Sequence, residues 1–255
     1  MLLAVDVGNT NMKFTVFDRE KIKVSFRIRT DSTKTSDELG FTLINHLNGQ
    51  NFDHENIDAV IISSVVPNIM HSLNNAIIKF FKTSPLIVGP GIKTGIKLVR
   101  TNPNEVGSDR IVNGVAALAK FGGPIIVADY GTATKFDLFA EDGAFEAAVT
   151  CPGVMLSAKS LKTGTAKLPE VEIVNPGSIL AKNTITSLQA GLFYGKIGEA
   201  EYIIDRMIKE YDHGPINVVV TGGLGRIIYE ETDRMQFLEP DLTMHGLRLI
   251  YDKNR

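Results

Sequence analysis

The sequence is poor in the features that mark several classes of protein. It has no tryptophan and a single cysteine, Cys151, and its 27 lysine and arginine residues are balanced by 29 aspartate and glutamate residues, giving a formal charge of −2. One cysteine cannot form an intrachain disulfide, so an oxidising compartment is not indicated. Without a basic excess, the composition favours neither nucleic acid nor an anionic membrane as a partner.

Long apolar runs are missing as well. No stretch approaches the roughly 20 apolar residues of a membrane-spanning helix. The first apolar run meets an acid at Asp6 and has no basic start, so it does not read as a signal peptide. We therefore expect a cytoplasmic protein. The five histidines are scattered, without metal-ligand spacing to one another or to Cys151, and neither a P-loop nor a protein-kinase signature occurs.

What remains is an ordinary globular composition. The chain has 255 residues, of which 44% are hydrophobic and 22% charged, enough for two compact lobes. Apolar periodicity predicts a mixture of strands and helices. The expected strands are 2–7, 12–18, 22–29, 58–63, 86–88, 124–128, 135–139, 144–150 and 216–220, and the expected helices are 36–47, 67–81, 105–121, 183–211 and 241–251.

One strand–loop–strand unit occurs twice. Asp6 and Gly8 follow a buried strand and open a hairpin, and Asp129 and Gly131 do the same 123 residues later. This repetition predicts an internal duplication. We expect an α/β protein with two duplicated lobes, residues 1–122 and 123–255, around a cleft.

The two loops have the chemistry of a phosphate site. A glycine allows a tight bend that turns backbone N–H groups toward an anion, and a carboxylate at the strand end can hold Mg²⁺ through water. Asn9, Thr10 and Asn11 add short donors to the first loop. Asp-x-Gly is also a common hairpin turn, but two such loops on equivalent hairpins suit a metal–triphosphate gripped from both sides.

Two further motifs have alternative interpretations. The glycine-rich turn after Val220 could lie against a purine or ribose, or could simply connect a strand to a helix. Asp109, near the start of an expected helix, could be a general base that accepts a hydroxyl proton. It could equally be a dipole partner or cap of that helix. Arg110 beside it would bind an anionic group of the substrate.

These segments resemble the type III pantothenate kinase family along nearly the whole chain. The family belongs to the superfamily of actin, sugar kinases and heat-shock ATPases, so the resemblance implies two ribonuclease H-like lobes around a nucleotide cleft. The matching segments are DVGNTN at 6–11, NPNEVGSDRIVN at 102–113, DYGTAT at 129–134, CPG at 151–153, TAKLP at 165–169, KNT at 182–184 and TGG at 221–223.

The resemblance also implies an activity. ATP would phosphorylate the primary hydroxyl of pantothenate to give 4′-phosphopantothenate, the first step of coenzyme A biosynthesis, with Mg²⁺, with K⁺ or NH₄⁺, and in a homodimer. Carried over by position, Asp109 is the proton acceptor, Asp129 the ligand of the monovalent cation and Asp6 the residue that holds Mg²⁺ through water. The ATP-binding residues are Asp6, Val7, Gly8, Asn9, Thr10, Asn11, Met12, Lys13 and Thr132, and the pantothenate-binding residues are Gly107, Ser108, Asp109, Arg110 and Thr184.

The sequence departs from the family pattern at three places. Arg100 stands where an aromatic residue is expected near the pantoyl pocket, Glu146-Ala147 where Gly-Gly is common, and Lys135 where a small polar residue is more usual. Two alternatives to pantothenate kinase stay open. One is another small-molecule kinase of the superfamily, acting on a sugar or carboxylate, and the other is a non-catalytic regulatory homologue.

A glycine stripe gives separate support to the homodimer. Gly191, Gly195 and Gly198 fall on one face of an expected helix, where each glycine costs about 1 kcal/mol relative to alanine. Close backbone packing, between subunits or within one lobe, would explain them.

Overall fold

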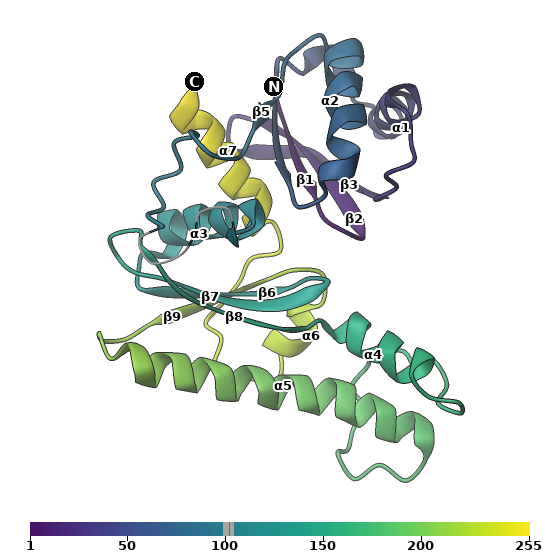
Figure 1. The fold of residues 1–255 in the computed structure, drawn as a ribbon, viewed down its shortest axis with the longest axis vertical. Coiled ribbons are helices and arrows are strands. Elements are labelled where there is room, and N and C mark those ends of the chain that lie inside the picture. Colours follow the sequence, from purple (N-terminus) through teal and green to yellow (C-terminus); the bar gives the residue numbers. More distant parts are fainter. Residues whose placement is uncertain (99–101, 103–104) are drawn as a thin grey trace. The chain divides into compact units, whose positions relative to one another are not determined.

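In the computed structural model, which describes residues 1–98, 102 and 105–255, the chain forms two compact units, whose elements Figure 1 labels. Unit 1 contains Met1–Ile96, the described residues between 102 and 116, and Leu242–Arg255, and unit 2 contains Lys97, Leu98 and Ala117–Asp241. Helix α3 (Ser108–Phe121) begins in unit 1 and ends in unit 2. The predicted boundary after residue 122 follows the duplication in the sequence and stays a prediction.

Unit 1 is built on a five-stranded mixed sheet of order β3-β2-β1-β4-β5. The first three strands form an antiparallel meander, and the last two run parallel to β1. The elements are β1 (Leu2–Val7), β2 (Asn11–Asp18), β3 (Lys21–Arg29), α1 (Ser36–Asn48), the 3₁₀ turn η1 (His54–Asn56), β4 (Ala59–Ser64), α2 (Pro67–Phe81), β5 (Leu86–Ile87) and the closing helix α7 (Leu242–Asn254).

Unit 2 repeats this plan with order β10-β9-β6-β7-β8. Here β6, β7 and β8 form the meander, and β9 and β10 are the parallel strands. The predicted fold class, two duplicated ribonuclease H-like α/β lobes, is confirmed. The elements are β6 (Ile125–Tyr130), β7 (Ala133–Phe139), β8 (Phe145–Pro152), α4 (Val154–Thr163), α5 (Thr184–Tyr211), β9 (Asn217–Thr221), α6 (Gly225–Tyr229) and β10 (Phe237–Leu238).

The two faces of the unit 1 sheet have different cores because side chains alternate along each strand. Leu3, Val5 and Val7 of β1 belong to the cluster that includes buried residues of α1 and α2. Leu2 and Ala4 belong to a second cluster, with residues of α3 and α7. By the same alternation, the side chain of Asp6 lies on the face of the sheet that packs against α3 and α7, after Leu2 and Ala4.

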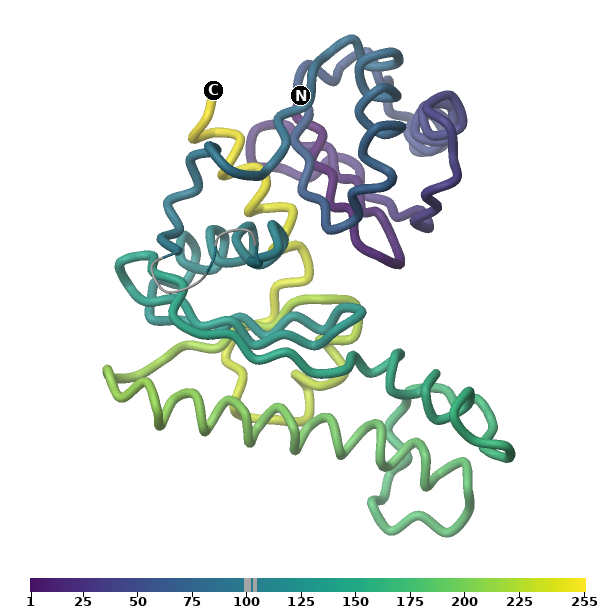
Figure 2. Tube along the Cα trace, in the orientation of Figure 1, coloured from purple at the N-terminus to yellow at the C-terminus, as the bar shows by residue number. Residues whose placement is uncertain are grey.

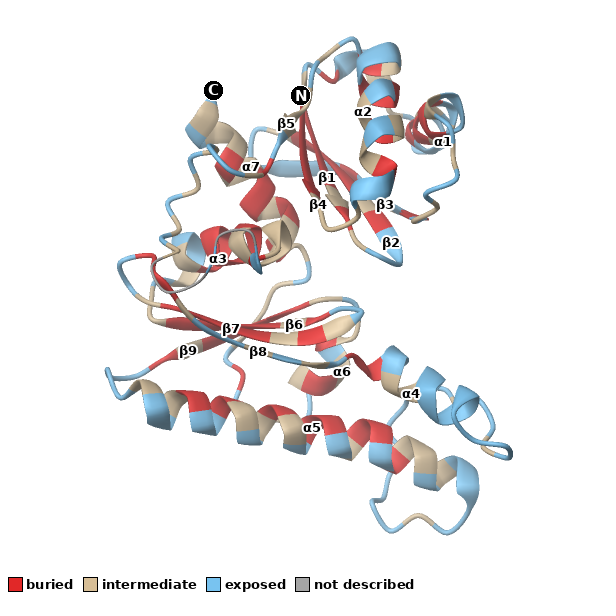
Figure 3. Cartoon of the chain, in the orientation of Figure 1, coloured by how far each residue is buried: buried red, intermediate tan, exposed pale blue. Residues whose placement is uncertain are grey.

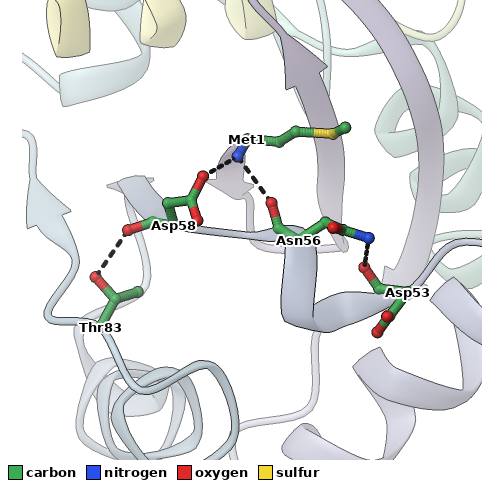
Figure 4. Close-up of polar contacts among 5 residues, drawn as sticks. All are labelled: Met1, Asp53, Asn56, Asp58 and Thr83. Carbon is green, nitrogen blue, oxygen red and sulfur yellow. Dashed lines mark hydrogen bonds and ion pairs between the residues drawn. The ribbon is translucent and has the colours of Figure 1, made fainter.

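The start of the chain is fixed beside β4, as Figure 4 shows. The terminal ammonium of Met1 donates to the carbonyl of Asn56 at 2.8 Å and pairs with Asp58 Oδ2 at 2.5 Å. The η1 turn is stabilised by Asn56 Nδ2, which donates to the Asp53 carbonyl. Thr83 Oγ1 donates to the Asp58 carbonyl. These contacts lie where β1 and β4 begin, and the parallel ladder that follows brings Asp6 level with Ser63.

Helix α5 covers one face of the unit 2 sheet. It is one continuous helix, and its buried residues lie along the side that faces the sheet (Figure 3). The segment 164–183 before it contains no helix or strand and carries the TAKLP motif and the first two residues of KNT (Figure 2). Among the described helices, none is both long and apolar enough to cross a membrane.

Candidate functional site

The first Asp-x-Gly loop is a closed four-residue turn between β1 and β2. The backbone N–H of Gly8 donates to the carbonyl of Asn11 at 3.1 Å, and Thr30 Oγ1 donates to the Gly8 carbonyl at 2.6 Å. A Cβ at Gly8 would lie 3.2 Å from the Asn11 oxygen, so a larger residue would crowd the turn. Asn9, Thr10 and Asn11 are exposed, which leaves this polar tip accessible to a ligand, as the sequence predicts.

Unit 1 brings this loop and the Asp109 motif together through β4. Asp6 lies beside Ser63 in the parallel ladder, and residues in register point to the same face of a sheet. The buried Ser63 hydroxyl lies 2.9 Å from the hydroxyl of Ser108, the first residue of α3. Ser108 Oγ also donates to the Ser64 carbonyl at 3.2 Å. The helix that carries Asp109 is therefore attached to the strand next to Asp6.

Gly107 and Asp109 shape the start of α3. The N–H of Arg110 donates to Asp109 Oδ1 at 2.9 Å, so the carboxylate folds back over the first turn. A Cβ at Gly107 would lie 2.5 Å from that oxygen, so a larger residue there would displace the Asp109 carboxylate. This position suits a dipole partner of the helix. It also holds a half-buried carboxylate in one orientation, as a proton acceptor requires.

The second Asp-x-Gly loop is a tighter hairpin between β6 and β7. The N–H of Gly131 donates to the Ala133 carbonyl at 3.2 Å, and Thr132 is exposed at the tip. Asp129 lies directly opposite Lys135 in the antiparallel ladder. Lys135 Nζ lies 3.1 Å from Asp129 Oδ2, and the two side chains are only 14% and 15% exposed. The lysine that departs from the family pattern thus pairs with the predicted cation ligand.

Two glycines, one from the CPG motif and one from the TGG motif, pack against the backbone of this second loop. A Cβ at Gly153 of CPG would overlap the carbonyl oxygen of Thr132 and lie 2.6 Å from that of Gly131. Gly222 of TGG has φ of +92°, and a Cβ there would lie 2.6 Å from the backbone of Tyr130. The glycines of both motifs therefore have a structural role: they let neighbouring segments pack directly on the loop backbone.

Replacing Gly153 by alanine should disturb the loop without removing any polar group. Overpacking of this kind costs about 1–3 kcal/mol of unfolding free energy, so we expect Gly153→Ala to lower Tm by several degrees and to weaken ATP binding through the displaced Thr132. Gly89→Ala is the matched control, because a Cβ at Gly89 meets nothing within 4 Å. Equal Tm and equal ATP affinity in the two variants would contradict the packing role.

The remaining predicted residues are placed but not brought together by the described contacts. Thr184 is exposed in the first turn of α5, after the N-cap Asn183, whose side chain accepts from the N–H of Thr186. It belongs to unit 2, whereas Gly107, Ser108, Asp109 and Arg110 belong to unit 1. Arg100 lies outside the described residues, as do Pro103 and Asn104 of the NPNEVGSDRIVN segment.

Cys151 has the environment of a structural thiol. Burial, followed by the nearby charge of Glu199, raises the pKa of the Cys151 thiol. A thiol kept in its neutral form is a poor nucleophile. Lys196 from α5 donates to the Pro152 carbonyl at 2.7 Å and to Glu199 at 2.9 Å, which ties the CPG segment to this helix.

Sequence reasoning missed Ser63 and Ser64. Like Asp6, these serines are polar residues at the end of a buried strand, and that position was the available signal. They were not selected because they carry no charge and no glycine follows them. Within the described residues there is no group of three or more histidine, cysteine, aspartate or glutamate side chains suited to hold a metal ion. A lone carboxylate such as Asp6 is compatible with Mg²⁺, because Mg²⁺ is usually held by one or two carboxylates together with substrate phosphates and water.

Comparison with known proteins supports one family. A family model described as type III pantothenate kinase matches residues 2–206. A type III pantothenate kinase of Agathobacter rectalis is 52% identical over 253 residues, covering 99% of this chain and 97% of the relative. One of Listeria monocytogenes is 46% identical over 255 residues, covering 100% and 98%.

Solved structures agree on the fold. The ethanolamine utilization protein EutJ of Carboxydothermus hydrogenoformans superposes with a TM-score of 0.54 at 17% identity, covering 97% of this chain and 89% of that one. At this level of identity the match supports the architecture alone.

Proposed function

The chain belongs to the type III pantothenate kinase family, and from that membership we propose how its residues phosphorylate pantothenate with ATP. One structural observation supports the assignment most directly: the Ser63–Ser108 contact joins the strand end at Asp6 to the helix start at Asp109. A phosphate loop and a candidate proton acceptor therefore belong to one packed unit. The product is 4′-phosphopantothenate, in the first step of coenzyme A biosynthesis.

The first hairpin would hold the phosphates of ATP. We assign Asp6, Val7, Gly8, Asn9, Thr10, Asn11, Met12 and Lys13 to this role. The exposed tip offers backbone N–H groups and short polar side chains, and Lys13 lies opposite Asp6 in the ladder. Asp6 would hold Mg²⁺ through water, and the bound ion would neutralise phosphate charge.

The start of α3 would bind pantothenate. Gly107, Ser108 and Arg110 would surround the substrate, with the Arg110 guanidinium suited to its carboxylate. Asp109 would accept the proton of the attacking hydroxyl. Its carboxylate is already oriented by the Arg110 N–H, so it would also hold the hydroxyl in line. Positioning and charge neutralisation supply most of the rate enhancement in phosphoryl transfer.

In the second hairpin, Thr132 would contact ATP, and Asp129 would bind a group that carries one positive charge. The resemblance implies K⁺ or NH₄⁺ at Asp129. The residues present do not suit a free ion there, because Lys135 Nζ lies 3.1 Å from the Asp129 carboxylate. We derive no step through K⁺ and return to this disagreement below.

We propose a homodimer formed through α5. Gly191, Gly195 and Gly198 are exposed, and no described atom beyond the neighbouring helix backbone lies within 4 Å of a Cβ built at any of them. The described side chains therefore leave room beside the stripe for the close approach of another helix, which supports the dimer. Tyr202 on the same helix is 67% exposed. In such a dimer Thr184 would contact pantothenate from the partner subunit.

Placing a charge in the stripe should separate the subunits. We expect Gly195→Arg to halve the mass measured by light scattering, because close helix approach leaves no room for a long side chain. Circular dichroism should show an unchanged helix content. A Gly195→Arg protein that keeps the mass of the wild type would exclude α5 as the interface, and a wild type with the mass of one chain would exclude the dimer.

The substrate is tested by an acceptor panel. ADP formation should be measured with pantothenate, acetate and hexoses at equal concentration, and we expect turnover with pantothenate only. Turnover with acetate or a hexose alone would identify another small-molecule kinase of the superfamily. ATP binding without turnover on any acceptor would favour a regulatory homologue. Since the reaction consumes ATP, we place it in the cytoplasm.

A further inference from the structure

The Asp129–Lys135 pair lies in a polar row that crosses the unit 2 sheet. Thr221 on β9, Asp129 on β6, Lys135 on β7 and Thr150 on β8 are consecutive register partners, so their side chains point to one face. Thr221 is buried, and both members of the ion pair are largely shielded from water. The row lies next to Gly131, at the base of the second phosphate loop.

A second carboxylate lies on the same face of the sheet. Asp137, two residues beyond Lys135 on the same strand and therefore on the same face, is 1% exposed. It lies opposite Val127 in the next row. Lys135 thus shares one face of the sheet with two largely buried carboxylates, Asp129 directly beside it and Asp137 in the next row. Carboxylates shielded from water favour an opposite charge beside them.

The same register occurs in the first lobe. Lys13 lies directly opposite Asp6 in the β1–β2 hairpin, as Lys135 lies opposite Asp129 in the β6–β7 hairpin. In both copies of the duplicated unit a lysine from the second strand therefore faces the aspartate that precedes the loop glycine.

We propose that the Lys135 ammonium supplies the monovalent positive charge at Asp129, so that this kinase needs neither K⁺ nor NH₄⁺. The inference rests on the proposed function. A lysine ammonium is a compact single charge with N–H donors, which makes it a chemical counterpart of NH₄⁺. It is also tethered directly across the ladder, so its effective concentration at Asp129 does not depend on the salt in solution.

A free ion would compete poorly with this group. A K⁺ bound to Asp129 beside Lys135 would meet a like charge at short range in a poorly solvated site, which disfavours the second cation. Binding of K⁺ would require the lysine to leave its partner. We therefore expect Asp129 to become a K⁺ ligand only when Lys135 is removed.

The test compares salts and variants in the pantothenate-dependent ADP assay. Rates are measured in KCl, NH₄Cl, NaCl and choline chloride at equal ionic strength. We expect the wild type to turn over equally in all four. In choline chloride, the turnover rate of Lys135→Ala should be about 10²–10³-fold below that of the wild type, as when one electrostatic group is removed from a reacting charge. KCl or NH₄Cl should restore most of this rate.

Two further variants separate the role of the charge from general damage. Lys135→Arg keeps a positive charge, so the ratio of its rates in KCl and choline should stay at one, whatever its absolute rate. Lys97→Ala removes another Lys–Asp pair of unit 2, in which Lys97 Nζ lies 2.7 Å from Asp142 Oδ2 on an exposed surface. This control should respond to the salts as the wild type does.

Thermal unfolding gives a readout that does not depend on activity. A ligand that binds only the folded state raises Tm, so KCl relative to choline chloride should raise the Tm of Lys135→Ala and leave that of the wild type unchanged. A wild type that turns over pantothenate only with K⁺ or NH₄⁺ would overturn the inference. A Lys135→Ala protein whose turnover rate and Tm are both unchanged by K⁺ would also overturn the inference. Absence of turnover in every salt would instead overturn the proposed function.

Discussion

Asp109→Asn should reduce the turnover of pantothenate by at least about tenfold to a thousandfold, since acid–base assistance typically contributes about 10²–10⁴-fold. The amide keeps the shape of the side chain but cannot accept the proton of the attacking hydroxyl. ATP binding should change little, because ATP is assigned to the hairpin at Asp6. The measurement is kcat for pantothenate together with a direct ATP titration.

A matched control separates this role from that of a helix dipole partner. Asp37 lies in the first turn of α1, as Asp109 lies in the first turn of α3, and pairs with Lys79 on the surface. If Asp109 only stabilises its helix, both asparagine variants should lose about 0.3–1 kcal/mol of stability, with turnover unchanged. An Asp109→Asn enzyme that is as active as Asp37→Asn would refute the role of proton acceptor.

Asp6→Asn should affect the nucleotide instead of the acceptor. Asp6 ends β1 beside Gly8 and is the carboxylate assigned to hold Mg²⁺ through water. We expect kcat/KM for MgATP to fall about 10²–10³-fold, as for loss of an electrostatic contact to the reacting phosphate, with KM for pantothenate much less affected. The measurement is a set of kinetics at varied ATP and Mg²⁺.

Asp18→Asn is the control for Asp6→Asn. Asp18 ends β2, at the opposite end of the same hairpin, and its side chain is 47% exposed beside Lys23. Its substitution should leave the kinetics unchanged. If Asp6→Asn behaves like Asp18→Asn, or if it raises KM for pantothenate and leaves that for ATP unchanged, the assignment of the first hairpin to ATP fails.

The parts of the site that could be predicted are those with local signals. An acid at the end of an apolar strand, followed by glycine and short polar residues, specifies a hairpin tip within a few residues. Gly8 and Gly131 therefore occupy the predicted turns. The repetition of that pattern also predicted the duplicated sheets, because each copy carries its own alternation of apolar residues.

The parts that could not be predicted depend on register and on packing between distant segments. The Ser63–Ser108 contact requires β4 to pair with β1 so that Ser63 falls beside Asp6, and neither serine carries a signal alone. The contact of Gly153 with Thr132 likewise needs the positions of two separate elements. The Asp129–Lys135 pair was accessible in principle, since the two residues flank one short hairpin, but the sequence marked Lys135 only as a departure from the family pattern.

Mass spectrometry of the reaction products tests the central claim most directly. Incubation of the full chain with MgATP and pantothenate should yield ADP and phosphopantothenate in equal amounts, and neither should form when pantothenate is left out. ATP consumption that is indifferent to pantothenate, or the absence of phosphopantothenate when ATP is consumed, would contradict the claim.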